Sequence, residues 1–245
     1  MGDSNGQVIV GGKSKGNRLD QLNRPTGVLI DKETNSLIIC DWDNTRVVRW
    51  SRRSDTTQGE ILIDKIDCYG LFMDDQRYLY VSDTQKHEVR RYRIGDQNGT
   101  LVAGGNGKGV GLNQLNFPTY IFVDKQQAVY VSDNENHRVI KWNKGAKEGI
   151  VVAGGLGKGE ALTHLWYPNG LFVDTSDTIY VADAWNHRVM RWPKGVKQGT
   201  IIVGGNSKGA GFNQFQYLRG LCFDRQGNLY AVDNWNNRVQ FFSIQ

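Results

Sequence analysis

Cysteine and proline are scarce in this chain, and long apolar runs are missing. The 245 residues include three cysteines and four prolines. Cys40, Cys68 and Cys222 lack the paired spacing of a zinc site, and an odd, sparse set does not build a disulfide scaffold, so we expect buried free thiols. No stretch approaches the roughly 18 apolar residues of a membrane span. Residues 1–10 lack the basic-then-apolar pattern of a secretory signal, so none is expected.

Motifs for nucleotide binding and catalysis are also missing. The linker “GGNGKG” at residues 104–109 lacks the GxxxxGK[ST] spacing, and no helical pattern follows it. His87, His137 and His187 recur at one turn position of separate repeats, so we expect them to lie apart rather than around a shared metal. His164 stands alone in a linker, which is weak support for catalysis. From these patterns we expect no cofactor, no metal site and no catalytic residue.

One short phrase occurs five times along the chain. Four copies, the first of which reads “YVSDTQKHEVRRY”, begin at Tyr80, Tyr130, Tyr180 and Tyr230, at intervals of 50 residues. The remaining copy, “IICDWDNTRVVRW” at Ile38, lies 42 residues before Tyr80. Five repeats of this length account for nearly the whole chain, so the repeat indicates the fold.

Each repeat contains four short segments rich in β-branched and aromatic residues. In the fourth repeat they are residues 170–174, 178–183, 188–192 and 200–205, bounded by Gly, Asn, Asp or Pro. The middle segments are apolar on both sides, which is typical of sheets packed between other sheets. The sequence therefore predicts an all-β fold in a single domain, residues 1–245, that forms a five-bladed β-propeller of four-stranded antiparallel blades.

The two ends of the chain are expected to close this ring. The last repeat has only three strands, and the N-terminal “NGQVIVGGKSKG” matches “QGTIIVGGNSKG” of the fourth repeat. We expect a strand at about residues 7–12 to complete the last blade, which would remove two exposed sheet edges. The alternative is that the chain forms part of a six-bladed propeller.

An acidic and a basic residue flank the turn in most copies of the phrase. Asp183 and Arg188 stand on either side of “AWNH” and face each other across a hairpin, and Asn186 suits the left-handed backbone of a tight turn. An opposite-charge pair across two strands is worth about 0.2–1 kcal/mol. We interpret four such pairs as structural, namely Asp41/Arg46, Asp133/Arg138, Asp183/Arg188 and Asp233/Arg238.

At these residues the sequence resembles the NHL-repeat propellers. Residues 136–138 and 186–188 read Asn-His-Arg, the family's signature, and residues 44–46 and 236–238 are looser versions of it. The linker “VAGGNGKGVGLNQLNFP” and the following “VD” and “YVSD” are similar to that family as well. The resemblance covers essentially the whole chain. It implies a propeller that mediates protein–protein contacts or binds RNA through a basic face, although familiar members commonly have six blades.

Turns between the second and third strands are expected to lie at the same end of the ring as the linkers between blades. This rim would combine tryptophans with cations. The candidate ligand-binding residues are Trp42, Trp185 and Trp235 from the turns, and Lys15, Arg18, Lys108, Lys158 and Lys208 from the linkers. Such a rim suits single-stranded nucleic acid, an acidic protein segment or a sugar. The plainer alternative is that the lysines solubilise the protein and the rings cover Gly-rich loops.

The second repeat departs from the pattern twice. Asp83 faces Glu88, a like-charge pair, and the linker before its first strand lacks the Gly-Lys loop. Drift is the simple explanation; the alternative is a gap in the rim that gives the ring a distinct docking side.

Four functions remain open at this point. The leading hypothesis is a monomeric, non-enzymatic scaffold that recognises a protein partner through the rim, without membrane insertion. The net charge of +5 also allows RNA or another polyanion. Related propellers that act as lyases or lactone hydrolases suggest a metal-dependent enzyme, and a multivalent lectin is possible, although Gln85 and Glu135 replace tryptophan at two turn tips. An enzyme would draw on aspartates that end the innermost strands, for which turn capping is the simpler role: Asp31, Asp74, Asp124, Asp174 and Asp224.

Overall fold

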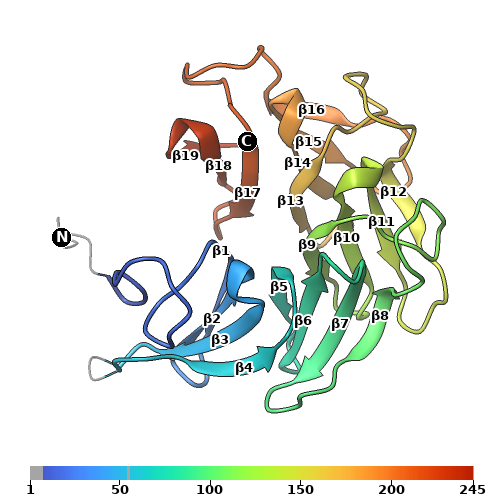
Figure 1. Cartoon of the computed structure of the whole chain (residues 1–245). Coiled ribbons are helices and arrows are strands. Elements are labelled where there is room, and N and C mark those ends of the chain that lie inside the picture. Colours follow the sequence, from blue (N-terminus) through green and yellow to red (C-terminus); the bar gives the residue numbers. More distant parts are fainter. Residues whose placement is uncertain (1–7, 54–55, 245) are drawn as a thin grey trace.

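A computed structural model describes residues 8–53 and 56–244 (Figure 1). These residues form short antiparallel strands, four 3-10 turns and loops, with no α-helix in the described ranges. No helix in this part of the chain is long and apolar enough to cross a membrane.

The strands group into five sheets in chain order, each a simple up-and-down arrangement. Blade 1 contains β1 (Pro25–Asp31), β2 (Ser36–Asp41), β3 (Arg46–Ser51) and β4 (Glu60–Asp64). Blade 2 contains β5 (Cys68–Met73), β6 (Tyr78–Asp83), β7 (Glu88–Arg93) and β8 (Thr100–Gly104). Blade 3 contains β9 (Pro118–Val123), β10 (Val129–Asp133), β11 (Arg138–Trp142) and β12 (Ile150–Gly154).

The last two blades follow the same plan, but the fifth is incomplete. Blade 4 contains β13 (Pro168–Val173), β14 (Ile179–Asp183), β15 (Arg188–Trp192) and β16 (Thr200–Gly204). Blade 5 contains only β17 (Leu218–Phe223), β18 (Leu229–Asp233) and β19 (Arg238–Phe242). Four 3-10 turns join second to third strands: η1 (Trp42–Asn44), η2 (Asn134–Asn136), η3 (Ala184–Asn186) and η4 (Asn234–Asn236).

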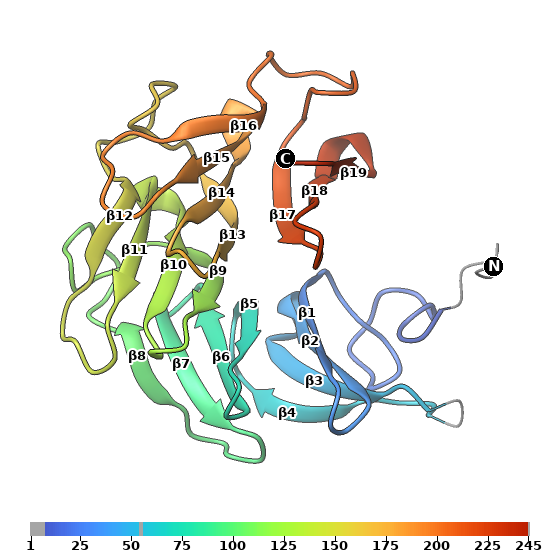
Figure 2. The ribbon, with the colours of Figure 1, turned by 180° about the vertical axis from the view of Figure 1, so that it is seen from behind.

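The blades surround a common centre, as Figures 1 and 2 show from opposite sides. The inner strands β1, β5, β9, β13 and β17 pack side by side in that order. The five-bladed β-propeller predicted from the repeat is therefore confirmed, and four of its five blades have the expected four strands.

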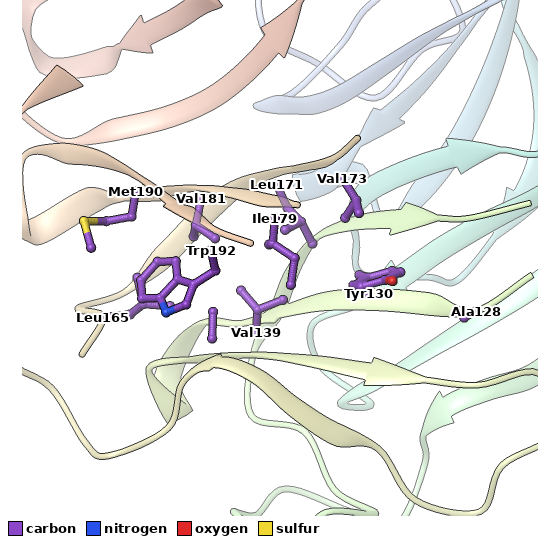
Figure 3. Close-up of a cluster of buried hydrophobic side chains, with 11 residues drawn as sticks. Ala128, Tyr130, Val139, Leu165, Leu171, Val173, Ile179, Val181, Met190 and Trp192 are labelled. Atoms are coloured by element: carbon purple, nitrogen blue, oxygen red, sulfur yellow. The ribbon is translucent and has the colours of Figure 1, made fainter. Parts of the chain in front are cut away.

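The hydrophobic core lies between the faces of neighbouring blades. Figure 3 shows the cluster between blades 3 and 4, where Val139 lies near Ile179 and Val181 and Tyr130 lies toward Val173. Met190 and Trp192 belong to the same cluster. Equivalent clusters lie between blades 1 and 2, 2 and 3, and 4 and 5. Because each central blade packs on both sides, its middle strands bury both faces, which explains their continuous apolar sequence.

The expected closure by an N-terminal strand at about residues 7–12 is not formed. Residues 8–12 have no strand structure, and residue 7 lies outside the described ranges. The segment that follows is anchored to blade 1, where the guanidinium of Arg46 donates to the carbonyls of Asn17 and Arg18. In both views the dark blue segment lies beside blade 1 and apart from β19. This anchorage places residues 8–12 away from the edge that they were expected to complete.

Within the described residues, two apolar sheet faces have no neighbouring blade, one on blade 5 and one on blade 1. Val239 of β19 is 61% exposed, whereas its counterpart Val189 in blade 4 is fully buried. Val28 of β1 is 62% exposed, and its counterpart Ile121 in blade 3 is buried. Cys222 lies exposed in β17 of the incomplete blade, so the expectation of three buried thiols is wrong for this residue and holds for the other two.

A buried ion pair connects each regular blade to the linker that precedes it. In blade 4, Arg188 Nε donates to Asp183 Oδ2 at 2.7 Å, and the terminal nitrogens of the guanidinium donate to the carbonyls of Glu160 and Ala161. Asp183 Oδ1 accepts the backbone N–H of Trp166, also at 2.7 Å. Equivalent ion pairs join Asp41 to Arg46, Asp133 to Arg138 and Asp233 to Arg238. We call this arrangement the arginine clamp.

The turn inside the clamp differs in one detail from the expectation. Asn186 lies in the 3-10 turn, and the left-handed residue is the next one, His187, with φ of 52°. The Asn186 amide instead donates to Asp183 Oδ2 and to the carbonyl of Gly159. Asparagine therefore serves here as a hydrogen-bond donor to the linker.

The two irregularities of blade 2 have one physical cause. Only residues 65–67 connect β4 to β5, so no linker loop offers carbonyls to an arginine at the clamp position. Glu88 occupies that position and accepts a hydrogen bond from Arg90 Nε at 2.6 Å. Asp83 accepts backbone N–H groups of Gln85 and Lys86, and burial raises its pKa.

The unequal burial of equivalent valines gives a direct test of the open side. Val189→Ala removes buried methyl groups and should lower the free energy of unfolding by on the order of 2 kcal/mol. Val239→Ala should change it by less than about 0.5 kcal/mol, because that side chain is already in water. Urea unfolding of both variants measures the difference, and equal losses would show that the face of β19 is covered.

The clamp predicts a similar contrast between two arginines. Arg188→Met leaves the buried Asp183 without its guanidinium and should cost about 3–5 kcal/mol of stability. Arg238→Met should cost less, since the Arg238 side chain is 29% exposed, compared with 5% for Arg188. Denaturant midpoints measure both losses; a larger cost for Arg238→Met would contradict this account of the clamp.

Candidate binding rim

The rim is the end of the ring where the second-to-third-strand turns meet the linkers. Backbone hydrogen bonds join the two: Trp185 N–H donates to the carbonyl of Trp166, and Trp235 N–H donates to that of Gln216. The inner strands also begin at this end, because each linker leads directly into one of them. Turn tips, linkers and the first residues of the inner strands therefore share one surface, and we call the place where these strands begin around the common centre the channel mouth.

Two aromatic clusters occupy the rim. The Trp185 cluster comprises Trp166, Tyr167, Trp185, Tyr217 and Trp235. Trp166 stacks on Trp185 with ring centroids 5.7 Å apart, and Tyr217 stacks on Trp235 at 5.0 Å. The structure thus brings two of the three predicted tryptophans together, with centroids 6.2 Å apart.

Trp42 lies in a separate group, the Trp42 cluster, formed with Tyr69, Phe117 and Tyr120. Its ring is half-buried, its indole N–H donates to Asp67, and the Arg24 guanidinium lies 4.7 Å from its centroid. The polar partners and the neighbouring rings hold Trp42 in place, so it presents less free surface than Trp185 and Trp235.

The predicted cations differ in their immediate surroundings. Lys158 Nζ lies 5.8 Å from the ring centroid of Trp166, and Lys208 Nζ lies 5.7 Å from that of Trp235, so both flank the Trp185 cluster. Arg18 is tied to Asp20 at 2.7 Å. Lys15 and Lys108 are exposed, with no ion pair or ring contact in the described part of the chain.

Sequence reasoning missed two residues at the channel mouth. Tyr120 stands where the other four inner strands carry glycine, and Arg219 stands where they carry Thr, Tyr, Thr and Asn. The Tyr120 hydroxyl reaches across the channel, where a Cβ on Gly220 would lie 3.5 Å from it. Alignment of the five inner strands shows both departures, so a signal for these residues was present in the sequence.

The turn histidines have a structural role between blades. His87 Nδ1 accepts the backbone N–H of Phe117 at 3.2 Å, and His137 Nδ1 accepts that of Tyr167 at 3.3 Å. Burial, reinforced by nearby lysines, lowers the pKa of His87 and of His187, and burial lowers that of His137. His87 and His137 are neutral acceptors near pH 7, and protonation would convert the acceptor nitrogen into a donor. The buried Nδ1 of His187 accepts no hydrogen bond in the described part of the chain.

The opposite end of the channel offers no metal site among the described residues. Asp74, Asp124 and Asp174 each accept two backbone N–H groups of the turn that follows, which is the capping role. No group of three or more His, Cys, Asp or Glu side chains in residues 8–53 and 56–244 is arranged to hold a metal ion.

Two cavities of about 590 and 580 Å³ lie between blades 2 and 3 and between blades 3 and 4. Trp142 lines the first and Trp192 the second, but these rings are only 2% and 1% exposed. A sugar stacks on an open ring face, which neither tryptophan presents.

Sequence comparison identifies repeats of one family. Residues 165–192 and 215–242 match the NHL repeat. No curated protein sequence matches the chain.

Solved structures share the architecture at low sequence identity. An auxiliary nutrient binding protein from Bacteroides thetaiotaomicron aligns with a TM-score of 0.72 and 17% identity, over 91% of this chain and 60% of that one. A gluconolactonase from Xanthomonas campestris gives 0.68 and 16%, over 92% and 80% of the two chains. Virginiamycin B lyase from Staphylococcus aureus gives 0.61 and 10%, over 95% and 72%. The present chain spans 60% of the length of the Bacteroides protein, and identities this low establish the fold alone.

The histidine contacts predict a pH dependence of stability. Because the folded-state pKa values lie below the ordinary value of about 6.5, the unfolded chain binds more protons, and this stability is lost as pH falls through the folded-state values. Replacing all three histidines by asparagine, the residue at the left-handed position 237, should flatten the loss between pH 7 and 5.

Urea unfolding at several pH values compares the triple variant with the parent chain. Burial raises the pKa of Asp183 to about 6, which acts in the opposite direction, but this contribution is common to both proteins and cancels in the difference. Identical pH profiles would contradict the assignment of the histidines as neutral rings near pH 7.

Proposed function

Since this chain is a β-propeller built of NHL repeats, we propose that it is a non-enzymatic binding module whose rim recognises a protein partner. The proposal rests on the Trp185 cluster. Trp185 is 41% exposed and Trp235 is 48% exposed, at turn positions where Gln85 and Glu135 stand in two other blades. Because blade 3 forms the same 3-10 turn with Glu135 at this position, the fold does not require tryptophan there.

The linkers beside this cluster support a protein partner. Phe212 is 97% exposed, Val110 is 76% exposed and Leu156 is 68% exposed, all on linkers of the rim. Exposed aromatic and aliphatic groups are typical of protein-binding surfaces, whereas a polyanion is bound chiefly through cations. The aromatic cluster and the apolar linkers together offer anchors for a peptide or a loop.

Single-stranded RNA is the second candidate function. Lys158 beside Trp166 and Lys208 beside Trp235 combine a cation with a ring, the pairing that stacks a base and attracts its phosphate. Glu135 and Glu160 lie on the same rim, where their negative charges would repel a continuous run of RNA phosphates. We therefore place a protein partner first.

Peptide selection on the immobilised protein tests the proposal. Peptides enriched from a random library should bind at least tenfold more weakly to the Trp185→Gln/Trp235→Gln variant, which adopts the residue of blade 2 at each turn. Phe241→Ser, which removes a 55% exposed ring from the open face of β19, is the matched control and should bind unchanged.

Two outcomes would contradict the proposal. Enriched peptides that bind the double variant as tightly as the parent chain would place binding elsewhere. Retention of a random single-stranded RNA pool at low salt, lost steeply as salt rises and in the absence of peptide binding, would favour RNA instead.

A further inference from the structure

Arg219 lies at the mouth of the central channel without a carboxylate partner. It is the second residue of β17, and its Nε donates to the hydroxyl of Tyr69 on β5 at 3.1 Å. Its Cζ lies 5.3 Å from the centroid of the Tyr69 ring. Within residues 8–53 and 56–244, Arg219 forms no ion pair, and its side-chain hydrogen-bonding neighbours are the phenol hydroxyls of Tyr69 and Tyr120. Arg188, by contrast, forms an ion pair with a carboxylate.

The groups around Arg219 supply no negative charge. The polar groups whose electrostatic interactions raise the pKa of its guanidinium are the hydroxyls of Tyr69, Tyr120 and Tyr217. Burial raises the pKa of Tyr69 and of Tyr120, so both are neutral phenols at neutral pH. A partly buried guanidinium surrounded by neutral groups has lost part of its hydration without gaining a counter-charge, which is unfavourable unless an anion binds.

The mouth is also the place where the two aromatic clusters meet. Tyr69 belongs to the Trp42 cluster and contacts Arg219 directly. Tyr217 belongs to the Trp185 cluster and precedes Arg219 by two residues. A ligand anion at Arg219 would therefore have an aromatic surface on either side of it.

We propose that Arg219 binds the carboxylate of an Asp or Glu side chain in the protein segment that the rim recognises. This inference rests on the proposed function and names the chemistry of that partner. The two terminal nitrogens form the fork that matches a carboxylate, and residues next to the acid pack on the aromatic clusters. Asp43 and Asp67 contact Arg24 and Trp42 on the Trp42 side of the mouth, where they oppose a chain of phosphates.

A double-mutant cycle on a selected peptide tests the inference. Peptides enriched on the parent chain should carry an Asp or Glu at a constant position, and its change to Asn or Gln should weaken binding about tenfold. Arg219→Gln should weaken the acidic peptide by a similar factor and leave the amide peptide unaffected. Arg225→Gln removes the same charge from the exposed turn that follows β17, at the opposite end of the ring, and should change both affinities less than about threefold.

Folding is monitored for each variant by its thermal midpoint. Arg219→Lys is the second variant, which keeps the charge without the fork and should retain part of the preference for the acidic peptide. If Arg219→Gln does not fold, the same comparison between acidic and amide peptides is made on Arg219→Lys. An undiminished preference for the acidic peptide would then contradict a two-pronged contact between the guanidinium and the carboxylate.

The outcomes separate this inference from the proposed function. Enriched peptides that need the Trp185 cluster but no acid, or whose acid is independent of Arg219, would overturn the carboxylate site and leave the protein-binding rim in place. Enrichment of no peptide would reject both. If the protein retained single-stranded RNA through Arg219 and bound no peptide, Arg219 would be a phosphate-binding residue and the proposal would be overturned.

Discussion

The buried pair of Asp183 and Arg188 shows what holds this molecule together. The carboxylate accepts hydrogen bonds from the turn, from the linker backbone and from the arginine, while the arginine donates to linker carbonyls. The Asp183 carboxylate and the Arg188 guanidinium depend on each other, since either one without the other would be a buried unpaired charge. Blade 2 illustrates the constraint: without a linker loop there is no acceptor for an arginine, and Glu88 stands in its place. The geometry of the rim follows from this network, because the clamp fixes each linker on its turn.

The blades could be predicted from the sequence because each one repeats the same pattern of short strands that must be packed on both faces. Spaced strands with two apolar faces have few arrangements other than a ring of sheets. The closing strand was predicted wrongly for a specific reason. Residues 5–16 resemble a fourth strand because they contain strand-forming residues. Pairing also depends on where the chain is anchored, and Arg46 binds the next segment on blade 1. Similarity between segments does not determine which sheet edge a segment meets.

The candidate site was only partly predictable. Trp185 and Trp235 could be identified because other copies of the turn lack tryptophan. Their contact with each other, and the half-buried setting of Trp42, depend on linker residues such as Tyr217 and on Asp67 that no repeat pattern indicates. Arg219 illustrates the limit: its residue type departs from the other inner strands, but its missing counter-charge is a property of the folded channel mouth.

The exposed face of β19 bears on how firmly the last blade is held. Among the described residues, the sheet of blade 5 has a hydrophobic cluster with blade 4 on one face only, so fewer buried contacts resist its detachment than resist that of blades 2, 3 or 4, and local unfolding should begin there. The contact between Arg219 on β17 and Tyr69 on β5 spans the channel from this weakly held blade to a well-packed one. A group bound between these two residues would hold blade 5 against the rest of the ring. By thermodynamic linkage, binding at the mouth would stabilise the last three strands, and order in these strands would strengthen the binding.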